Sequence, residues 1–319
     1  MRHLCRLISF AFALTTVVAL GIPTDARAEK EKELFKTKAI RAIITPDGKS
    51  IVAAGDNVRL IDPVAKKSVV FRKTYARIVL STEGKVLALI KQEETDKTDG
   101  VELIDLTTKK RQAQFSVSTK GHVASALSPG GKLFVHGGFK ELYSIDTKTG
   151  KQVAEAKNLA GQPWSVSFSP DGKQIACGFT ENKVILFEAE GLKPGHSIPM
   201  PDWVQSVAFT PDGKQLAASA GMTISLIDVA SGKITGKLAG TKDKIVRSVA
   251  FGADGKVLAS CDGMLVTLWD MGTAKPLDTI KCPAEVFFLS LSTDAKMLTV
   301  SLEDNTAYLY DVSAATGAK

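Results

Sequence analysis

The chain has 319 residues, of which 44% are hydrophobic and 24% charged, so it is long and apolar enough to bury a core and is not a disordered sequence. Its formal net charge is +7, and +5 remains once a predicted N-terminal leader with three arginines and one aspartate is removed. That mild excess is far below the balance typical of nucleic-acid-binding proteins, so we predict no nucleic-acid partner.

Residues 1–28 have the pattern of a secretory signal peptide. Arg2 and Arg6 form a basic segment, residues 7–22 form an apolar run, and residues 26–28 (Ala-Arg-Ala) supply small side chains for cleavage. The pattern predicts cleavage after Ala28 and export to the periplasm or the exterior. A retained membrane anchor is the alternative, although a spanning helix needs roughly 20 apolar residues. No later segment is long enough to span a membrane.

After the leader, residues 32–38 (KELFKTK) form a lone predicted strand, and a series of similar units follows. Residues 203–234 are the clearest unit. An alternating apolar run is followed by the turn Pro211-Asp212-Gly213-Lys214, a second short strand, and a third strand that ends in Asp228. Alternation predicts half-buried strands, and the proline, aspartate and glycine predict a tight reversal. One such meander has two apolar faces and needs neighbours to cover them.

Two markers of this unit recur seven times, at intervals of about 40 residues. The lysine of the first hairpin recurs at Lys49, Lys85, Lys132, Lys173, Lys214, Lys256 and Lys296. The acid that ends the third strand recurs at Asp62, Asp105, Asp146, Glu188, Asp228, Asp270 and Asp311. Short strands repeated at this period predict an all-β fold, a seven-bladed β-propeller that forms one domain over residues 29–319.

The last unit ends near Asp311 and lacks a fourth strand. We therefore predict that the lone N-terminal strand completes the last blade and closes the ring, which removes the exposed sheet edges that promote aggregation. The apolar side chains of each first strand are expected to pack between adjacent blades. Their small neighbours, such as Ser165 and Ala208, are expected to let the inner strands crowd the axis.

Three cysteines remain after the leader: Cys177, Cys261 and Cys282. An odd, sparse set is not a disulfide framework, so at most one bridge is expected. The pair Cys261–Cys282 is one possibility, since both fall near one end of the sixth unit, and buried free thiols are the other.

The sequence contains no pattern of residues typical of a catalytic or cofactor site. His122 and His136 can approach each other but have no carboxylate or thiolate at metal-ligand spacing, and structural hydrogen bonding is the competing interpretation. There is no haem-attachment motif, dinucleotide-binding glycine motif or P-loop, and no serine has a histidine placed for a triad. We predict no catalytic residues, no metal and no cofactor.

Three stretches carry a resemblance to a known family: VAFTPDGKQLAASAG, VAFGADGKVLASCDGMLVTLWD and VSFSPDGKQIACGF. They resemble the WD-repeat β-propeller family and its bacterial secreted, YVTN-like relatives, over residues 30–313. The Gly-His of that family occurs here only as Gly121-His122, and its Trp-Asp only as Trp269-Asp270. The His–Ser–Asp–Trp hydrogen-bond set of the family is therefore incomplete in every unit.

The resemblance implies a topology in which the four strands of a blade, a to d, place the a–b hairpins and c–d turns on one face. This hairpin face collects the seven repeated lysines and other lysines of the turns. A basic face can attract acidic partners. The alternative is that charged turns keep the hairpins soluble, since aspartates lie beside several of these lysines.

The opposite face, here called the b–c face, carries the b–c turns and the connections into strand a. The second unit has an insertion there, residues 91–100, predicted as a projecting polar loop. Aromatic and arginine side chains gather at this rim and are typical of binding hot spots, although the aromatics can instead plug the ends of the blades. The candidate partner-binding residues are Arg41, Tyr75, Arg77, Trp164, Trp203, Arg247, Phe287 and Phe288.

Since propellers of this family are mostly rigid platforms for partners, the resemblance implies a module that binds protein partners. Together with the leader and the absence of a catalytic pattern, we predict an exported, monomeric, non-catalytic protein that binds its partner through the b–c face. Fold alone does not determine function. The alternatives are a propeller enzyme of the lactonase or quinoprotein kind, which would need converging acids, histidines or a cofactor site at the channel mouth, and a cell-envelope assembly factor, which differs from a binding module only in its partner.

Overall fold

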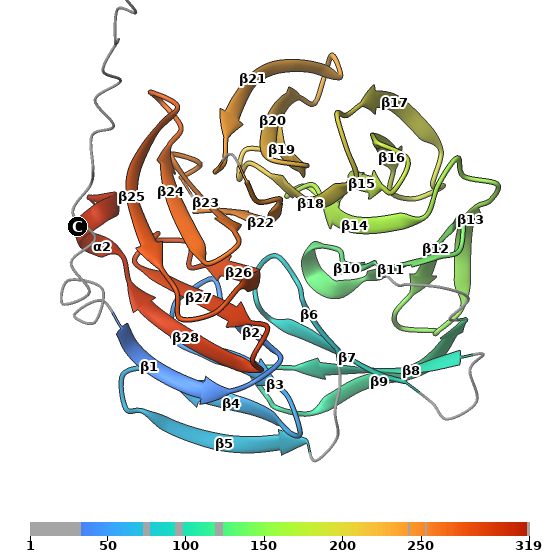
Figure 1. The fold of residues 1–319 in the computed structure, drawn as a ribbon. Coiled ribbons are helices and arrows are strands. Elements are labelled where there is room, and N and C mark those ends of the chain that lie inside the picture. The colour runs from blue at the N-terminus through green and yellow to red at the C-terminus, as the bar shows by residue number, and fades with distance from the viewer. Residues whose placement is uncertain are drawn as a thin grey trace, which may run out of the picture.

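The computed structural model describes residues 33–72, 77–92, 98–118, 124–241, 243–252 and 254–317. These residues form almost only β-strands, arranged as seven four-stranded antiparallel sheets around a central axis (Figure 1). The predicted seven-bladed β-propeller is therefore confirmed. The predicted leader, Tyr75 and His122 lie outside the described residues.

Six blades use four strands consecutive in the sequence, in the order a, b, c, d across the sheet. Blades 1 to 3 consist of β2 (Arg41–Ile44), β3 (Ile51–Ala54), β4 (Val58–Asp62), β5 (Lys67–Arg72), β6 (Arg77–Leu80), β7 (Val86–Gln92), β8 (Thr98–Asp105), β9 (Arg111–Ser118), β10 (Ser125–Leu127), β11 (Leu133–Gly138), β12 (Glu141–Asp146) and β13 (Gln152–Ala156).

Blades 4 to 6 consist of β14 (Pro163–Phe168), β15 (Gln174–Phe179), β16 (Lys183–Glu188), β17 (Pro194–Pro199), β18 (Val204–Phe209), β19 (Gln215–Ala220), β20 (Thr223–Asp228), β21 (Lys233–Ala239), β22 (Val246–Phe251), β23 (Val257–Asp262), β24 (Leu265–Asp270) and β25 (Lys275–Lys281). Blade 7 consists of β26 (Val286–Leu291), β27 (Met297–Leu302), β28 (Thr306–Asp311) and β1 (Glu33–Lys38). Two short helices are also described, η1 (Pro129–Gly131) and α2 (Ser313–Thr316), the second of which follows the last strand.

The ring closes through the N-terminal strand, as predicted. β1 pairs antiparallel with β28, with Lys36 opposite Tyr308 and Lys38 opposite Thr306. Blade 7 is also joined to blade 1, because the backbone N–H of Ala42 in β2 donates to the Ser301 hydroxyl in β27 at 2.9 Å. Blade 7 therefore combines the first and last strands of the propeller, which lie side by side in Figure 1.

Four of the a–b hairpins, in blades 1, 4, 5 and 7, share one local side-chain network, and blade 5 shows how it works. The Thr210 hydroxyl donates to the Asp212 carboxylate at 2.7 Å, and the same carboxylate accepts the backbone N–H of Lys214 at 3.0 Å. The backbone N–H of Gln215 donates back to the Thr210 hydroxyl at 3.0 Å. Gly213 takes the positive φ of 70° that the reversal requires. The repeated sequence of the turn thus specifies its conformation without help from the rest of the fold.

The core lies between adjacent blades. One cluster, for example, packs Val184 and Leu186 of blade 4 against Val207 and Leu216 of blade 5. This agrees with the expectation that first-strand apolar side chains fill the spaces between blades. Each blade therefore has its apolar faces covered only when its neighbours are present, which is why the sheets assemble into a ring.

The insertion in blade 2 differs from the prediction. Instead of a loop over residues 91–100, strands β7 and β8 continue into it, with Lys91 paired to Gly100 and Gln92 to Asp99. Only residues 93–97 lie outside the described part of this hairpin. The described residues of the insertion therefore lengthen the β7–β8 hairpin by main-chain pairing.

Cys177, Cys261 and Cys282 are all buried and none forms a disulfide, so of the two interpretations the structure has free thiols. Within the ranges that the structure describes, there is no helix of the length and apolar character needed to cross a membrane.

Candidate functional site

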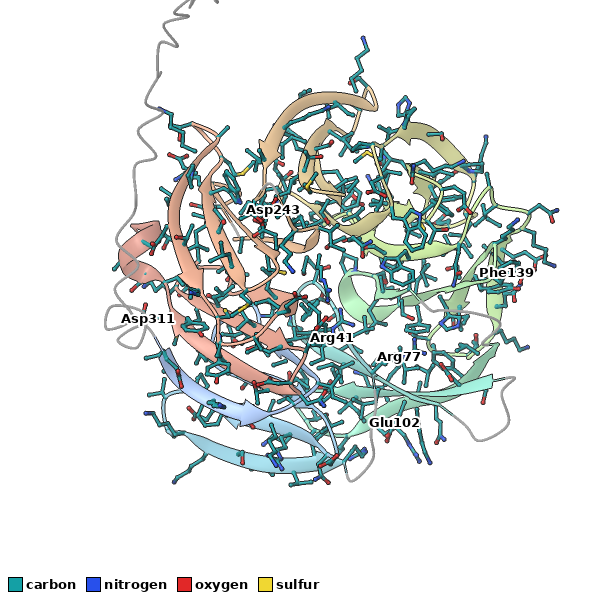
Figure 2. All side chains as sticks on the ribbon, in the orientation of Figure 1. Arg41, Arg77, Glu102, Phe139, Asp243 and Asp311 are labelled. Atoms are coloured by element: carbon teal, nitrogen blue, oxygen red, sulfur yellow. The ribbon has the colours of Figure 1, made fainter. Side chains whose placement is uncertain are left out.

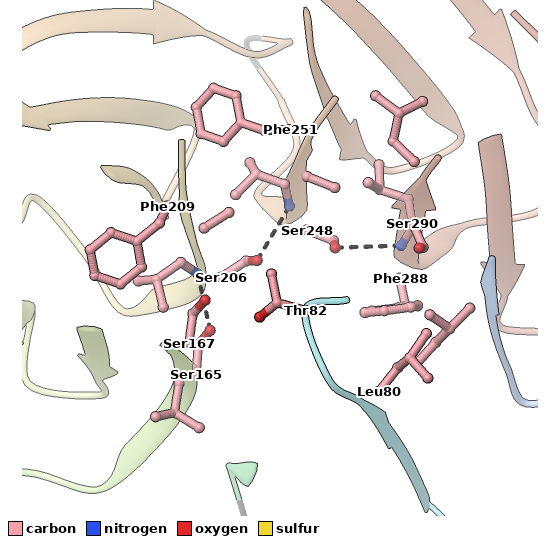
Figure 3. A pocket seen from close by; sticks show the side chains of 18 of the residues that line it. Leu80, Thr82, Ser165, Ser167, Ser206, Phe209, Ser248, Phe251, Phe288 and Ser290 are labelled. Carbon is pink, nitrogen blue, oxygen red and sulfur yellow. Dashed lines mark hydrogen bonds between the residues drawn. The ribbon is translucent and has the colours of Figure 1, made fainter. Parts of the chain in front are cut away.

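A cavity of about 910 Å³ occupies the centre of the ring and is lined by the inner strands of the blades (Figure 3). Its wall includes Ser165, Ser206 and Ser248 from blades 4, 5 and 6. Five of the candidate residues line this cavity: Arg41, Trp164, Arg247, Phe287 and Phe288. The structure therefore places these five residues along the wall of the central channel.

Arg41 and Phe288 contact each other across the junction of blades 1 and 7. The guanidinium carbon of Arg41 lies 3.8 Å from the centroid of the Phe288 ring, which is close cation–π geometry. Figure 2 shows Arg41 near the centre of the ring of blades. Burial, and then the nearby positive charge of Arg77, lowers the pKa of Arg41 to about 10, so the side chain stays charged at neutral pH.

Arg77 occupies the same position in blade 2 as Arg41 does in blade 1, three residues before the end of strand a. Its guanidinium forms an ion pair with Asp99, whose side chain is only 2% exposed. Asp99 belongs to the lengthened β7–β8 hairpin, so the insertion brings a counter-ion to Arg77. Arg77 is not among the residues that line the central cavity.

Arg247 lies in a group of balanced charges between blades 6 and 7. It forms ion pairs with Glu303 and, at 3.2 Å, with Glu285. Lys244 also pairs with Glu285, at 2.9 Å, and lowers its pKa through a hydrogen bond and its positive charge. The two cations and two anions cancel, so Arg247 brings no net charge to the channel.

The two candidate tryptophans are brought together. The ring centroids of Trp164 and Trp203 lie 6.3 Å apart with the rings tilted by 49°, a common arrangement of interacting aromatic side chains. Trp164 is half-buried and lines the channel, whereas Trp203 is exposed. Together they connect the channel wall to the surface of blade 5.

Sequence reasoning missed three exposed apolar residues beside Trp203. Met222 lies in the b–c turn of blade 5, Met264 in the b–c turn of blade 6, and Ile245 just before β22. Their exposed fractions are 48%, 38% and 41%, and that of Trp203 is 50%. A signal existed in the repeated Gly-Met pairs, Gly221-Met222 and Gly263-Met264, because a turn does not require an exposed methionine.

These four residues, here called the apolar patch, follow one edge of the ring. Val204 pairs with Ala220, which places Trp203 beside the turn that contains Met222. The backbone N–H of Val246 donates to the Gly221 carbonyl at 2.8 Å and links that turn to Ile245. Val246 pairs with Asp262, which places Ile245 beside the turn that contains Met264, so the patch residues follow the b–c turns and strand entries of blades 5 and 6.

The hairpin face has a different character. The Asp–hydroxyl network of Thr210 recurs in blades 1, 4 and 7, around Asp47, Asp171 and Asp294. The acids that end strand c act similarly, since Asp228 accepts the N–H and hydroxyl of Ser231 in the c–d turn. These carboxylates stabilise turns, and the lysine side chains beside them, such as Lys173 at 82% exposure, extend into solvent.

Among the described residues, no group of three or more His, Cys, Asp or Glu side chains is arranged to hold a metal ion. His136 is fully buried and its Nδ1 lies 3.3 Å from the Ser125 hydroxyl. His122, with which the sequence suggested a pair, is outside the described ranges. In blade 6 the Trp269 indole donates to the Ser260 hydroxyl at 2.8 Å, which is a remnant of the hydrogen-bond set implied by the resemblance.

Comparison with protein families matches three consecutive stretches to the WD40 model (WD domain, G-beta repeat): residues 155–188, 192–228 and 232–270. Each match begins on or next to the outer strand of one blade and ends with the third strand of the next. The matched units include the blades that contain Trp164 and Trp203. No curated protein matches this sequence.

Proposed function

We propose that this WD-repeat β-propeller is an exported, non-catalytic interaction module that binds a protein partner through its b–c face. WD-repeat propellers are commonly platforms for protein partners. The leader pattern of residues 1–28 supports export, and the partner belongs to the same cellular compartment.

The observation that carries the proposal is the position of the apolar patch. Exposed tryptophan, methionine and isoleucine side chains cost free energy in water, and contiguous exposed apolar surface often marks an interaction site. Methionine adapts its shape to a partner, and tryptophan is enriched at binding hot spots. All four patch residues lie in b–c turns or directly before strand a of blades 5 and 6, and one of them, Ile245, also lines the central cavity.

The differences between blades on this face support the same conclusion. On the hairpin face, related turn networks recur in several blades because turn formation requires them. At the equivalent position of strand a, toward the b–c face, blades 4 to 6 have serine (Ser165, Ser206 and Ser248), blade 7 has Phe288, and blades 1 and 2 have arginine (Arg41 and Arg77). Turn geometry does not require that variety, and binding residues tend to collect on loops carried by a rigid scaffold.

The channel lining bears on the enzyme alternative. Its charged side chains are Arg41 and Arg247, and the rest of the wall is hydroxyl-bearing, amide or apolar. A propeller lactonase or quinoprotein needs converging acids or a cofactor site, and no observation on the described residues favours either.

The test starts with a photo-crosslinking amino acid at position 222 in the mature protein, which captures the partner from the cell envelope. The partner's affinity is then measured for the wild type and for the triple variant Trp203→Ser/Met222→Ser/Met264→Ser. Loss of hot-spot contacts costs at least about 2 kcal/mol, so we expect a complex weaker by about thirtyfold or more.

The matched control is Val69→Ser/Val153→Ser/Leu277→Ser. These residues are also exposed and apolar, but they lie on the outer strands of blades 1, 3 and 6. We expect the control to bind like the wild type. A partner that leaves the patch variant but not the control supports the proposal, and the reverse result shows that the binding surface is elsewhere.

A further inference from the structure

The central cavity carries one positive charge that no described residue neutralises. Arg41 and Arg247 are the charged residues in its lining. Arg247 is balanced by Glu285 and Glu303, as described above. Arg41 has no carboxylate within ion-pair distance among the described residues, and its Nε atom is buried without a hydrogen-bond acceptor among them.

Arg41 is partly buried, and a charge that is largely removed from water is normally paired, because its removal from water is costly. Phe288 covers one side of the Arg41 guanidinium and provides attraction but no negative charge. The neighbouring Arg77 adds repulsion, although Asp99 largely offsets its charge. The depressed pKa of Arg41 has this same origin. The position is therefore incomplete in the protein alone and suited to an anion from outside.

The opposite wall of the channel offers hydrogen-bond donors at the same depth. Ser165, Ser206 and Ser248 each precede the last residue of strand a by three positions, as Arg41 does in blade 1. Figure 3 shows these three hydroxyls at the junctions between blades.

Each of the three serine oxygens accepts a backbone N–H from the next blade. The donors are Val207 at 3.0 Å, Val249 at 3.3 Å and Leu289 at 3.4 Å. A hydroxyl that accepts through its oxygen still has its own proton to donate. No described residue takes these protons, so this wall presents donors to whatever occupies the channel.

We propose that the channel mouth binds a carboxylate supplied by the protein partner, either an acidic side group or the terminal carboxylate of its polypeptide. This carboxylate pairs with Arg41, while carbonyl groups of the partner next to it accept hydrogen bonds from the serine hydroxyls. The planar guanidinium suits the two carboxylate oxygens. A carboxylate brings a single charge to match the single cation, whereas a phosphate brings more. The assignment of the carboxylate to a protein partner rests on the proposed function, whereas the anion site at Arg41 is argued independently of it.

The site is tested without the partner, using N-acetylglycine as a mimic of a terminal peptide carboxylate, acetate as a free small acid and N-acetylglycinamide as the uncharged control. Arginine Nε–H signals of ¹⁵N-labelled protein are followed at constant ionic strength. We expect a saturable shift of the Arg41 signal with N-acetylglycine, weaker binding of acetate, and no shift with the amide.

Binding of N-acetylglycine is then measured by calorimetry in two variants. Arg41→Gln removes the charge and is expected to weaken binding about tenfold or more. Arg41→Lys keeps the positive charge but lacks the planar guanidinium, and it serves as the second variant if Arg41→Gln fails to fold. Arg111→Gln, on the exposed outer strand β9, is the control and is expected to bind like the wild type.

Equal binding by Arg41→Gln and the wild type, or the same shift with the amide, overturns the site. The partner as source has its own readout: excess N-acetylglycine should displace the captured partner, and Arg41→Gln should weaken its complex. If N-acetylglycine binds at Arg41 but does neither, the carboxylate belongs to a free small acid and the partner assignment is wrong. Failure at Arg41 leaves the apolar-patch experiment unaffected, so the two proposals fail separately.

Discussion

At the scale of single residues, the same kind of side chain has different roles on the two faces of the ring. Asp212 has its hydrogen-bond partners within five residues of sequence, so its role is local. Arg41 has its nearest aromatic contact, Phe288, at the other end of the sequence. The first residue stabilises a turn, whereas the second depends on ring closure for its surroundings.

The turn network gives a stability prediction. Thr210→Val keeps the shape of the side chain and removes the hydroxyl that joins Asp212 to the backbone of Gln215. Two hydrogen bonds at about 0.5–1.5 kcal/mol each are lost, so we expect the free energy of unfolding to fall by about 1–3 kcal/mol. Urea denaturation measures the change. Thr82→Val, at an exposed turn position, is the control, and an equal effect in both variants would contradict the argument.

The same networks predict that the free energy of unfolding falls at acid pH. A hydrogen bond from Thr45, Ser169 or Thr210 lowers the pKa of Asp47, Asp171 or Asp212, respectively, below the usual 3.8. These groups bind fewer protons in the folded state, so their stabilisation is complete above the unfolded-state pKa and is lost as the pH falls through the folded-state pKa.

We therefore expect the free energy of unfolding to decline below about pH 4, and Asp212→Asn to decline less steeply there than the wild type. Denaturation at a series of pH values from about 2 to about 7 checks this, with Asp56→Asn on an exposed b–c turn as control. If the free energy of unfolding falls equally with pH in Asp212→Asn and the wild type, the turn carboxylates are not the cause of the acid destabilisation.

At the scale of elements, β1 is the strand on which closure of the ring depends. It supplies the outer strand of blade 7, and the partly buried Leu34 and Phe35 pack against a core cluster that includes Ala307 and Leu309. Every other blade takes its four strands from one continuous stretch of sequence.

Deletion of residues 30–37 removes most of β1 and leaves β28 as an unpaired edge. We expect a large fall in melting temperature, followed by circular dichroism, and an increased tendency to aggregate. Truncation after Ser313 is the control because it removes most of α2 and leaves every strand paired. If the N-terminal deletion melts like the full mature protein, the ring does not depend on β1.

At the scale of the whole molecule, the ring has two faces at opposite ends of one central channel. The b–c face presents side chains that vary between blades, and the hairpin face presents repeated turns. The proposed binding at one end and the stable turns at the other are a consistent division of roles for a rigid platform. The proposed export would determine which partners this platform meets.

Export is tested by the N-terminus of the protein isolated from its native source. Cleavage after Ala28 predicts Glu29 as the first residue in mass spectrometry of the intact protein. A substitution at the cleavage site, Ala28→Leu, should block processing and leave residues 1–28 attached. Recovery of the wild type from the membrane with those residues still present would instead support the retained anchor.

Much of the architecture could be predicted from the sequence because it depends on local chemistry. The Ser/Thr-Pro-Asp-Gly-Lys turn around Asp171 or Asp212 makes its hydrogen bonds within a few residues of sequence. Its recurrence at intervals of about 40 residues gives the number of blades. The missing fourth strand of the last unit likewise implied closure by the N-terminal strand, since an open edge would be costly.

The candidate site could be predicted only in part, because its properties depend on contacts across the ring. The sequence indicated which face Arg41 and Arg77 share, but only the assembled blades show that Asp99 neutralises Arg77 and leaves Arg41 beside Phe288. The apolar patch likewise forms only when Met222 and Ile245, from neighbouring blades, come together. Counter-ions and surface patches are set by long-range packing, and turn chemistry contains no information about them.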